Sequence, residues 1–222
     1  MQKLIIKGKK KLSGSINISG SKNATLPILA AALLTDKVIT LTNIPLVQDV
    51  YTMINLLKFI GLNIEMSKKS KILKVSSNRK LKTIAPYNLL KTMRAGVLVL
   101  GPLLAKYKKA KVSLPGGCAI GARPVNLHLF ALEKLGAKIK IKNGYIYASA
   151  KNGLKGNIIK FPSISVGATE NAILASVCAK GKTIISNCAI EPEIQDLIVF
   201  LKKLGCNINF VGKRKISIIG TK

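Results

Sequence analysis

Cys118 is the residue whose sequence context most clearly suggests chemistry. It lies in the segment SLPGGCAIGARPVNLH, residues 113–128. The glycine pair before it predicts a flexible turn rather than a packed element, and a thiol exposed near a cation has a raised thiolate fraction. Arg123 and nearby lysines are the candidate cations. A free cysteine is more often a small core residue, but the flanking Pro-Gly-Gly and Gly-Ala-Arg-Pro favour a loop.

The three remaining cysteines, in contrast, lie within apolar helix or strand patterns, which favours a core position for each: Cys178, Cys188 and Cys206. The four cysteines contain no CxxC pair, and the chain has a single histidine, so zinc-ligand spacing and a disulfide scaffold are both absent. No metal or other cofactor is expected, and this cysteine usage is typical of a reducing cytoplasm.

Two other segments could bind anions. In SGSKNA, Lys22 and Asn23 stand at the start of a predicted helix, where free backbone N–H groups and the helix dipole favour negative charge. A lysine at a helix start is common, so this signal is weak when taken alone. In LKTMRAG, Arg94 interrupts an apolar stretch, where a buried unpaired guanidinium would be costly. The sequence favours an anion facing Arg94, and an internal ion pair with an acidic residue is the alternative.

The remaining polar candidates have structural interpretations. His128 follows Pro124 in a predicted helix, and a packing or orienting role is favoured over catalysis. Glu191 and Glu193, in IEPEIQDL, suit the start of the last helix because acidic groups interact favourably with the dipole there.

Composition excludes several classes of function. The net charge is +29, yet only four of the 37 basic residues are arginine and the lysines are dispersed, so nucleic acid is not expected as the main partner. The longest apolar runs are about half the ~20 residues of a membrane span, which predicts core helices and no membrane partner. The N-terminal residues do not form a signal peptide.

The chain also contains an internal repeat. The segments LKFIGLNI, LEKLGAKI and LKKLGCNI each run from a helical apolar pattern into a glycine and then into an alternating strand pattern; these glycines are Gly61, Gly136 and Gly205. A glycine at such a joint predicts a left-handed helix cap.

Each joint belongs to a larger unit. A β-rich run precedes it, an apolar helix pattern precedes that run (KNATLPILAAALL, YNLLKTMRAGVLVL and GATENAILASVCA), and a further strand follows. The predicted unit is strand, helix, strand, helix, strand, strand, spanning about residues 14–78, 82–150 and 156–220. Because each unit alone would expose an apolar helix face, we expect one α/β (α+β) lobe with central helices and outward sheets.

The loop carries a family resemblance. PGGC followed by GARPVNLH resembles the UDP-N-acetylglucosamine enolpyruvyl transferases (UDP-N-acetylglucosamine 1-carboxyvinyltransferases) of the enolpyruvyl transferase and EPSP synthase superfamily, whose pattern is PGGC, two residues, then GxRPVDLH. The resemblance covers the whole chain and implies an inside-out α/β barrel lobe. It implies phosphoenolpyruvate binding by Lys22, Asn23 and Arg123, and UDP-N-acetylglucosamine binding by Arg94, Arg123, Pro124, Val125, Asn126, Leu127, Ser163, Ile164, Ser165 and Val166.

The implied reaction adds the sugar 3-hydroxyl to C2 of phosphoenolpyruvate while C3 is protonated, and phosphate then leaves. The resemblance makes Cys118 the general acid at C3, without a metal, in the first committed step of peptidoglycan precursor synthesis. Two positions depart from the family pattern: Asn126 stands where aspartate is usual, and Ser163 where a basic residue is frequent. The loss of charge at Asn126 puts uridine recognition most in doubt.

Family members are about twice as long and build the active site between two such lobes. The resemblance therefore predicts that residues 1–20 form strands packed on a second lobe, that residues 21–222 form the three-unit lobe, and that this chain alone has little or no turnover. The enzyme acting on shikimate 3-phosphate is the enzymatic rival, although it uses no loop cysteine. A non-catalytic remnant that binds a uridine sugar nucleotide, or pairs with a separate second lobe, is the other alternative.

Overall fold

The computed structural model describes residues 3–77, 80–116 and 125–221. Its helices are α1 (Lys22–Ala31), α2 (Gln48–Ile60), α3 (Tyr87–Leu90), α4 (Leu100–Tyr107), α5 (Asn126–Lys134), α6 (Val166–Ser176) and α7 (Pro192–Lys203), with 3-10 helices η1 (Ala32–Leu34) and η2 (Arg94–Val99). Its strands are β1 (Ile39–Leu41), β2 (Asn63–Ser67), β3 (Ile72–Ser76), β4 (Ile84–Ala85), β5 (Lys109–Ser113), β6 (Lys138–Lys142), β7 (Tyr145–Ser149), β8 (Ile158–Lys160), β9 (Lys182–Ser186), β10 (Asn207–Gly212) and β11 (Lys215–Ile219).

The strands form three separate sheets, one for each predicted unit. Their orders are β1-β3-β2, β4-β5-β7-β6 and β10-β11-β9-β8. In the second and third sheets the leading strand pairs in parallel with the strand that follows the first helix, β4 with β5 and β8 with β9. Every other pairing is antiparallel. The predicted strand and helix order is therefore confirmed for the third unit, and for the second unit except that its first helix is interrupted.

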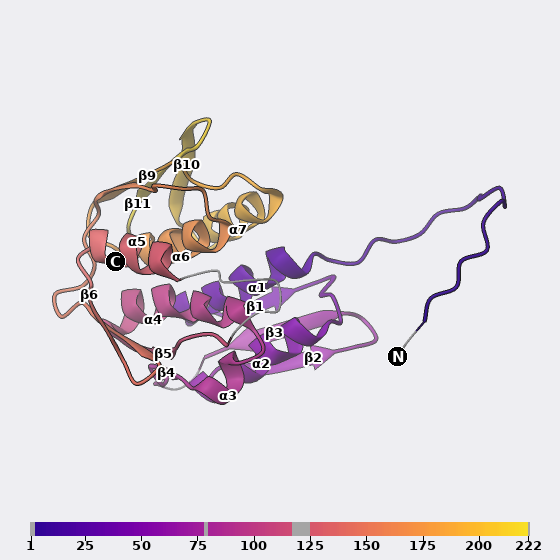
Figure 1. The fold of residues 1–222 in the computed structure, drawn as a ribbon, viewed down its shortest axis with the longest axis horizontal. Helices are drawn as coiled ribbons and strands as arrows, with labels where there is room; N and C mark the ends of the chain where they lie inside the picture. Colours follow the sequence, from indigo (N-terminus) through magenta and orange to yellow (C-terminus); the bar gives the residue numbers. More distant parts are fainter. Residues whose placement is uncertain (1–2, 78–79, 117–124, 222) are drawn as a thin grey trace.

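The first unit differs because its sheet has three strands and no leading strand. No strand is assigned to residues 3–20, which extend away from the lobe as the indigo segment of Figure 1. Their apolar side chains face solvent, including Leu4 at 85% exposure and Ile16 at 85%. The strand expected at the start of this unit is not formed in the structure. That residues 1–20 pack on a second lobe stays a prediction.

The three glycine joints are confirmed. Gly61, Gly136 and Gly205 follow α2, α5 and α7 with φ of 125°, 92° and 96°, which is the left-handed region that favours glycine. Each is followed directly by a strand, β2, β6 or β10.

The helices α1, α4 and α6 lie between the first and third sheets, as Figure 1 shows. α6 is the most central, since every residue from Ala168 to Ser176 is buried, and α1 is buried along most of its length. Apolar side chains of all three units form one hydrophobic core. The expectation of one lobe with central helices is therefore confirmed, while the structure does not show a closed barrel.

The first helix of the second unit departs from the sequence prediction. The apolar segment YNLLKTMRAGVLVL does not form one helix; it is divided into α3, η2 and the start of α4. Met93 is extended at the break, with φ −134° and ψ 100°. Gly96 packs so tightly on Leu90 that an added Cβ would lie 2.8 Å from Leu90 Cγ. The break places Arg94 at a helix start, and the close contact between Gly96 and Leu90 accompanies it.

Candidate functional site

Five helices begin around one cleft of about 320 Å³. Residues from the N-terminal portions of α1, η2, α5, α6 and α7 contribute to its wall. Free N–H groups at helix starts carry positive partial charge, so the convergence favours an anionic ligand. The wall consists of Asn23, Leu26, Pro27, Arg94, Ala95, Val97, Leu98, His128, Val166, Gly167, Glu170 and Glu193.

The starts of α1 and α6 are built in the same way. Ser21 caps α1 by accepting a hydrogen bond from Ala24 N at 3.3 Å, and Ser165 caps α6 through Ala168 N at the same distance. In each helix a threonine hydroxyl, of Thr25 or Thr169, donates back to the backbone carbonyl of the capping serine. Serine caps of this kind fix where a helix begins. Here they fix the wall residues Asn23, Val166 and Gly167.

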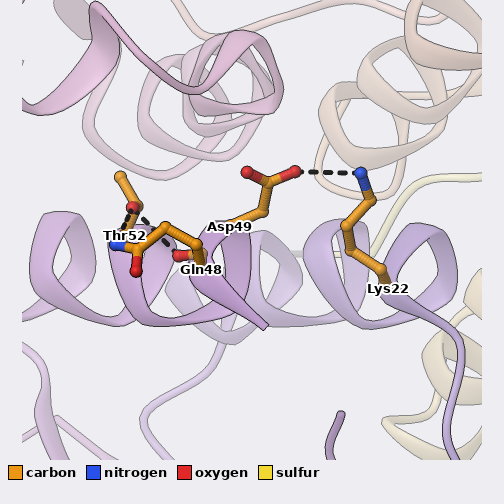
Figure 2. A network of polar contacts seen from close by, with 4 residues as sticks. All are labelled: Lys22, Gln48, Asp49 and Thr52. Atoms are coloured by element: carbon orange, nitrogen blue, oxygen red, sulfur yellow. Dashed lines mark hydrogen bonds and ion pairs between the residues drawn. The ribbon is translucent and has the colours of Figure 1, made fainter. Parts of the chain in front are cut away.

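The structure separates the two predicted phosphoenolpyruvate residues of α1. Asn23 lines the cleft. Lys22 is not part of the cleft wall and forms an ion pair with Asp49 of α2, with 2.9 Å between Nζ and Oδ2 (Figure 2). The Lys22 side chain is 46% exposed, and such exposed pairs contribute only about 0 to 1 kcal/mol. An anion at the helix start can therefore compete for Lys22 at a small energetic cost.

Arg94 and His128 both line the cleft. Arg94, the first residue of η2, is half-buried, whereas His128 on α5 is only 5% exposed. Burial, and then the positive charge of Arg94, lower the pKa of His128 to about 4, so its ring is neutral near pH 7. His128 Nδ1 lies 3.1 Å from the Asn171 amide nitrogen. Because that amide donates, Nδ1 accepts and the ring proton lies on Nε2. The orienting interpretation of His128 fits this geometry.

Asn171 was not predicted from the sequence, yet it links the elements around the cleft. Its side chain is fully buried on α6. The amide nitrogen donates to Val97 O of η2 at 3.2 Å, and the carbonyl oxygen accepts from Gly101 N of α4 at 2.8 Å. An added Cβ on Gly101 would lie 2.3 Å from that oxygen, so glycine permits this approach. An asparagine within an apolar helix pattern is the one sequence signal of this role.

Two carboxyl groups face the same cleft, and neither was predicted from the sequence to bind a ligand. Glu170 of α6 is 5% exposed, and Glu193 of α7 is half-buried. Burial, and then the negative charge of Glu193, raise the pKa of Glu170 to about 8. Glu170 is therefore largely uncharged at pH 7. Its sequence signal was an acid inside the otherwise apolar helix GATENAILAS.

The structure places the residues predicted for the sugar nucleotide at two neighbouring helix starts. Val125, Asn126 and Leu127 form the start of α5, which packs on α6. Arg94 and Val166 line the cleft itself. Asn126, Ser163 and Ile164 are exposed and outside its wall, while the side chain of Ser165 caps α6. The other residues named here, 125–127 and 163–165, form a rim beside the cleft and are not part of its wall.

Cys118, Arg123 and Pro124 lie outside the described residues. Gly116, which begins this loop, packs on α3: an added Cβ would lie 2.2 Å from Lys91 O. The prediction that packing plays no part in the glycine pair is wrong for this residue, because only glycine permits so close a backbone approach.

The other cysteines are core residues, as predicted. Cys188 is buried, and Cys178 and Cys206 are half-buried. Burial raises the pKa of all three thiols, which keeps them protonated and unreactive. Among the described residues, no group of three or more His, Cys, Asp or Glu side chains is arranged to hold a metal ion. Within the same residues, no helix has the length and apolar character needed to cross a bilayer.

Comparison with protein families gives a match to EPSP synthase (3-phosphoshikimate 1-carboxyvinyltransferase) over residues 6–222. The chain belongs to the EPSP synthase family. Solved members share the fold at low sequence identity. The enolpyruvyl transferase NikO from Streptomyces tendae has a TM-score of 0.78 at 18% identity, covering 96% of this chain and 50% of that chain. An EPSP synthase from Acinetobacter baumannii has a TM-score of 0.76 at 19% identity, covering 94% of this chain and 47% of that chain.

Relatives within the EPSP synthase family are considerably closer in sequence. A UDP-N-acetylglucosamine 1-carboxyvinyltransferase of Pelagibacter ubique is 61% identical over 220 residues, covering 99% of this chain and 52% of the relative. The enzyme of the same name from Endomicrobium trichonymphae is 54% identical over 220 residues, with the same coverage. The chain spans about half the length of the curated relatives it matches.

Proposed function

We propose that this chain is one lobe of an enzyme that transfers enolpyruvate from phosphoenolpyruvate to the 3-hydroxyl of UDP-N-acetylglucosamine and releases phosphate. The observation that carries the proposal is the 61% identity to a UDP-N-acetylglucosamine 1-carboxyvinyltransferase over 99% of this chain. The cleft supports it chemically, because converging helix starts with Asn23 and Arg94 in the wall suit a phosphate ligand. The proposed reaction begins peptidoglycan precursor synthesis in the cytoplasm.

Within this proposal each group has a role. Lys22, Asn23 and Arg123 bind phosphoenolpyruvate, and Lys22 leaves Asp49 when the phosphate arrives. Cys118 protonates C3 as the sugar oxygen attacks C2, and the cations stabilise the charge that develops on the departing phosphate. Arg94 and the rim at the starts of α5 and α6 bind the sugar nucleotide. The three units close into an inside-out α/β barrel, and a second lobe supplies the remaining groups.

Covalent labelling of Cys118 by the epoxide fosfomycin tests the identity of the site. We expect the wild-type chain, supplied with a second lobe and UDP-N-acetylglucosamine, to gain one fosfomycin adduct by mass spectrometry. Cys118→Ser should lose that adduct because serine has no thiolate, whereas Cys206→Ser should keep it. Labelling that persists in Cys118→Ser would exclude Cys118 as the acid of this reaction.

Phosphate release tests the dependence on a second lobe. The 222-residue chain alone should release no phosphate from phosphoenolpyruvate and UDP-N-acetylglucosamine, and addition of a second lobe should restore turnover. Turnover by the chain alone would refute this part of the proposal. Faster phosphate release with shikimate 3-phosphate as the acceptor would favour the rival reaction, that of the enzyme acting on shikimate 3-phosphate. Saturable binding of the nucleotide sugar without turnover in the two-lobe mixture would favour a non-catalytic protein that binds a uridine sugar nucleotide.

A further inference from the structure

Glu170 is a buried acid that opens onto the cleft. The residue is 5% exposed and forms part of the cleft wall. Within residues 3–77, 80–116 and 125–221, no hydrogen bond to its carboxyl group is found. Buried polar side chains nearly always have a hydrogen-bond partner. Because the carboxyl oxygens of Glu170 are not among the fully buried, unpartnered atoms of the described residues, they reach the cleft, where a ligand can supply the missing partner.

Glu170 shares the described part of the cleft wall with three other ionisable groups, and its protonation changes the net charge of that wall. From the elements packed on α6, the groups facing it are Arg94 of η2, His128 of α5 and Glu193 of α7. The ionisable residues of the other packed elements lie away from the cleft wall: Lys106 and Tyr107 end α4, and Lys182 and Lys215 are exposed on β9 and β11.

With His128 neutral, two ionised carboxylates would outnumber the single guanidinium within the described part of the wall. This excess of negative charge would oppose the helix starts, which favour an anion. A protonated Glu170 removes the excess and also offers an O–H donor to the ligand.

We propose that Glu170 and Glu193 act as a carboxyl pair in the cleft wall, and that a phosphate-bearing ligand binds there together with one proton held on Glu170. The proton comes from solvent and no covalent bond changes. The proposal rests on the proposed function for the choice of phosphoenolpyruvate as ligand. The inference goes beyond the proposed function because it assigns two carboxyl groups to ligand binding.

The proton linkage predicts how affinity depends on pH. In the free chain, burial and the charge of Glu193 hold the pKa of Glu170 at about 8. A ligand that binds only the protonated form should therefore bind about tenfold more weakly at pH 9 than at pH 7. Glu170→Gln, which cannot ionise, should show the same affinity at both pH values.

Isothermal titration calorimetry with the full 222-residue chain tests the proposal. Phosphoenolpyruvate and inorganic phosphate are titrated separately near pH 8.5, in two buffers of different ionisation enthalpy, so that protons taken up per ligand can be counted. The wild-type chain should take up about three quarters of a proton more than Glu170→Gln, because about a quarter of Glu170 is already protonated at that pH. Glu133→Gln, an exposed glutamate of α5, is the matched control and should behave as the wild type.

Several outcomes would contradict the proposed role of the Glu170 and Glu193 pair. Equal proton uptake by the wild type and Glu170→Gln would do so, as would absence of binding by either probe at any pH. If Glu170→Gln fails to fold, Glu193→Gln replaces it. That variant should move the loss of affinity to lower pH, because the charge that raises the pKa of Glu170 is gone, and an unmoved profile would contradict the proposal.

The outcomes also separate this inference from the proposed function. Proton-linked phosphate binding without saturable binding of UDP-N-acetylglucosamine would support the pair and count against the proposed transferase. Enolpyruvate transfer in the two-lobe mixture without the proton linkage would support the transferase and remove the pair.

Discussion

At the scale of single residues, the sequence directed attention to cations and to one cysteine, and it gave no ligand role to the acids. Lys22, Asn23 and Arg94 were recognisable because helix starts and charges in apolar stretches have a direct chemical meaning. Glu170 was not recognised, because its role depends on helix ends that come from four other parts of the chain. Residue type and spacing describe one helix and cannot show what packs against it.

Glu170 and His128 should make stability depend on pH in opposite directions. The folded state raises the pKa of Glu170 from 4.5 to about 8. Between these values the folded chain holds a proton that the unfolded chain has released, so stability falls as pH rises through this window. The folded state lowers the pKa of His128 from 6.5 to about 4, so its contribution to stability is lost as pH falls through that window.

The Glu170→Gln variant isolates the two effects. It should lose about 2 kcal/mol of unfolding free energy from pH 7 to pH 5, from His128 alone. Its stability relative to the wild type should rise from pH 5 to pH 7.5 by an amount on the order of 3 kcal/mol. Urea denaturation at the three pH values measures both differences. A wild type and variant with parallel pH profiles would show that Glu170 titrates normally.

At the scale of elements, the sequence predicted joints more reliably than helix continuity. The three glycine caps are local, because a left-handed residue after a helix needs only glycine and the turns beside it, and Gly61, Gly136 and Gly205 all adopt positive φ. The break at Met93 is not marked by a proline, and the close contact between Gly96 and Leu90 appears only in the folded chain. Apolar spacing in that segment favours a helix regardless of the contact.

Replacement of Asn171 by alanine should loosen the elements around the cleft. The change would leave Gly101 N, Val97 O and His128 Nδ1 without their partner, and unsatisfied buried groups cost about 1 to 3 kcal/mol each. We expect a loss of about 3 kcal/mol in unfolding free energy by urea denaturation. Asn152→Ala, at an exposed turn, should change it by less than about 0.5 kcal/mol. Equal effects of the two changes would contradict the role of Asn171.

At the scale of the whole molecule, the first twenty residues and the lobe should be energetically independent in this chain. The apolar side chains between Leu4 and Ile18 are 71% to 92% exposed, so they contribute little burial to the folded lobe. Closer contact begins only at Gly20, where an added Cβ would lie 2.0 Å from Asn43 O.

Deletion of residues 1–18 should therefore change the unfolding free energy of the chain by less than about 0.5 kcal/mol. Urea denaturation of the full and shortened chains, compared by midpoint and slope, measures this difference. A larger loss would mean that the segment packs on the lobe in solution. Improved solubility of the shortened chain would agree with the removal of exposed apolar side chains.

The interrupted helix of the second unit also bears on how such a lobe diverges from a repeated ancestor. The first and third units keep the same serine and threonine arrangement at α1 and α6, as expected of copies under a shared packing constraint. The second unit abandons the pattern, and its broken helix places Arg94 at the cleft. The same unit carries the loop with Cys118. Two of the three units thus share one way of starting their first helix, and the unit that lacks it contributes Arg94 to the cleft wall.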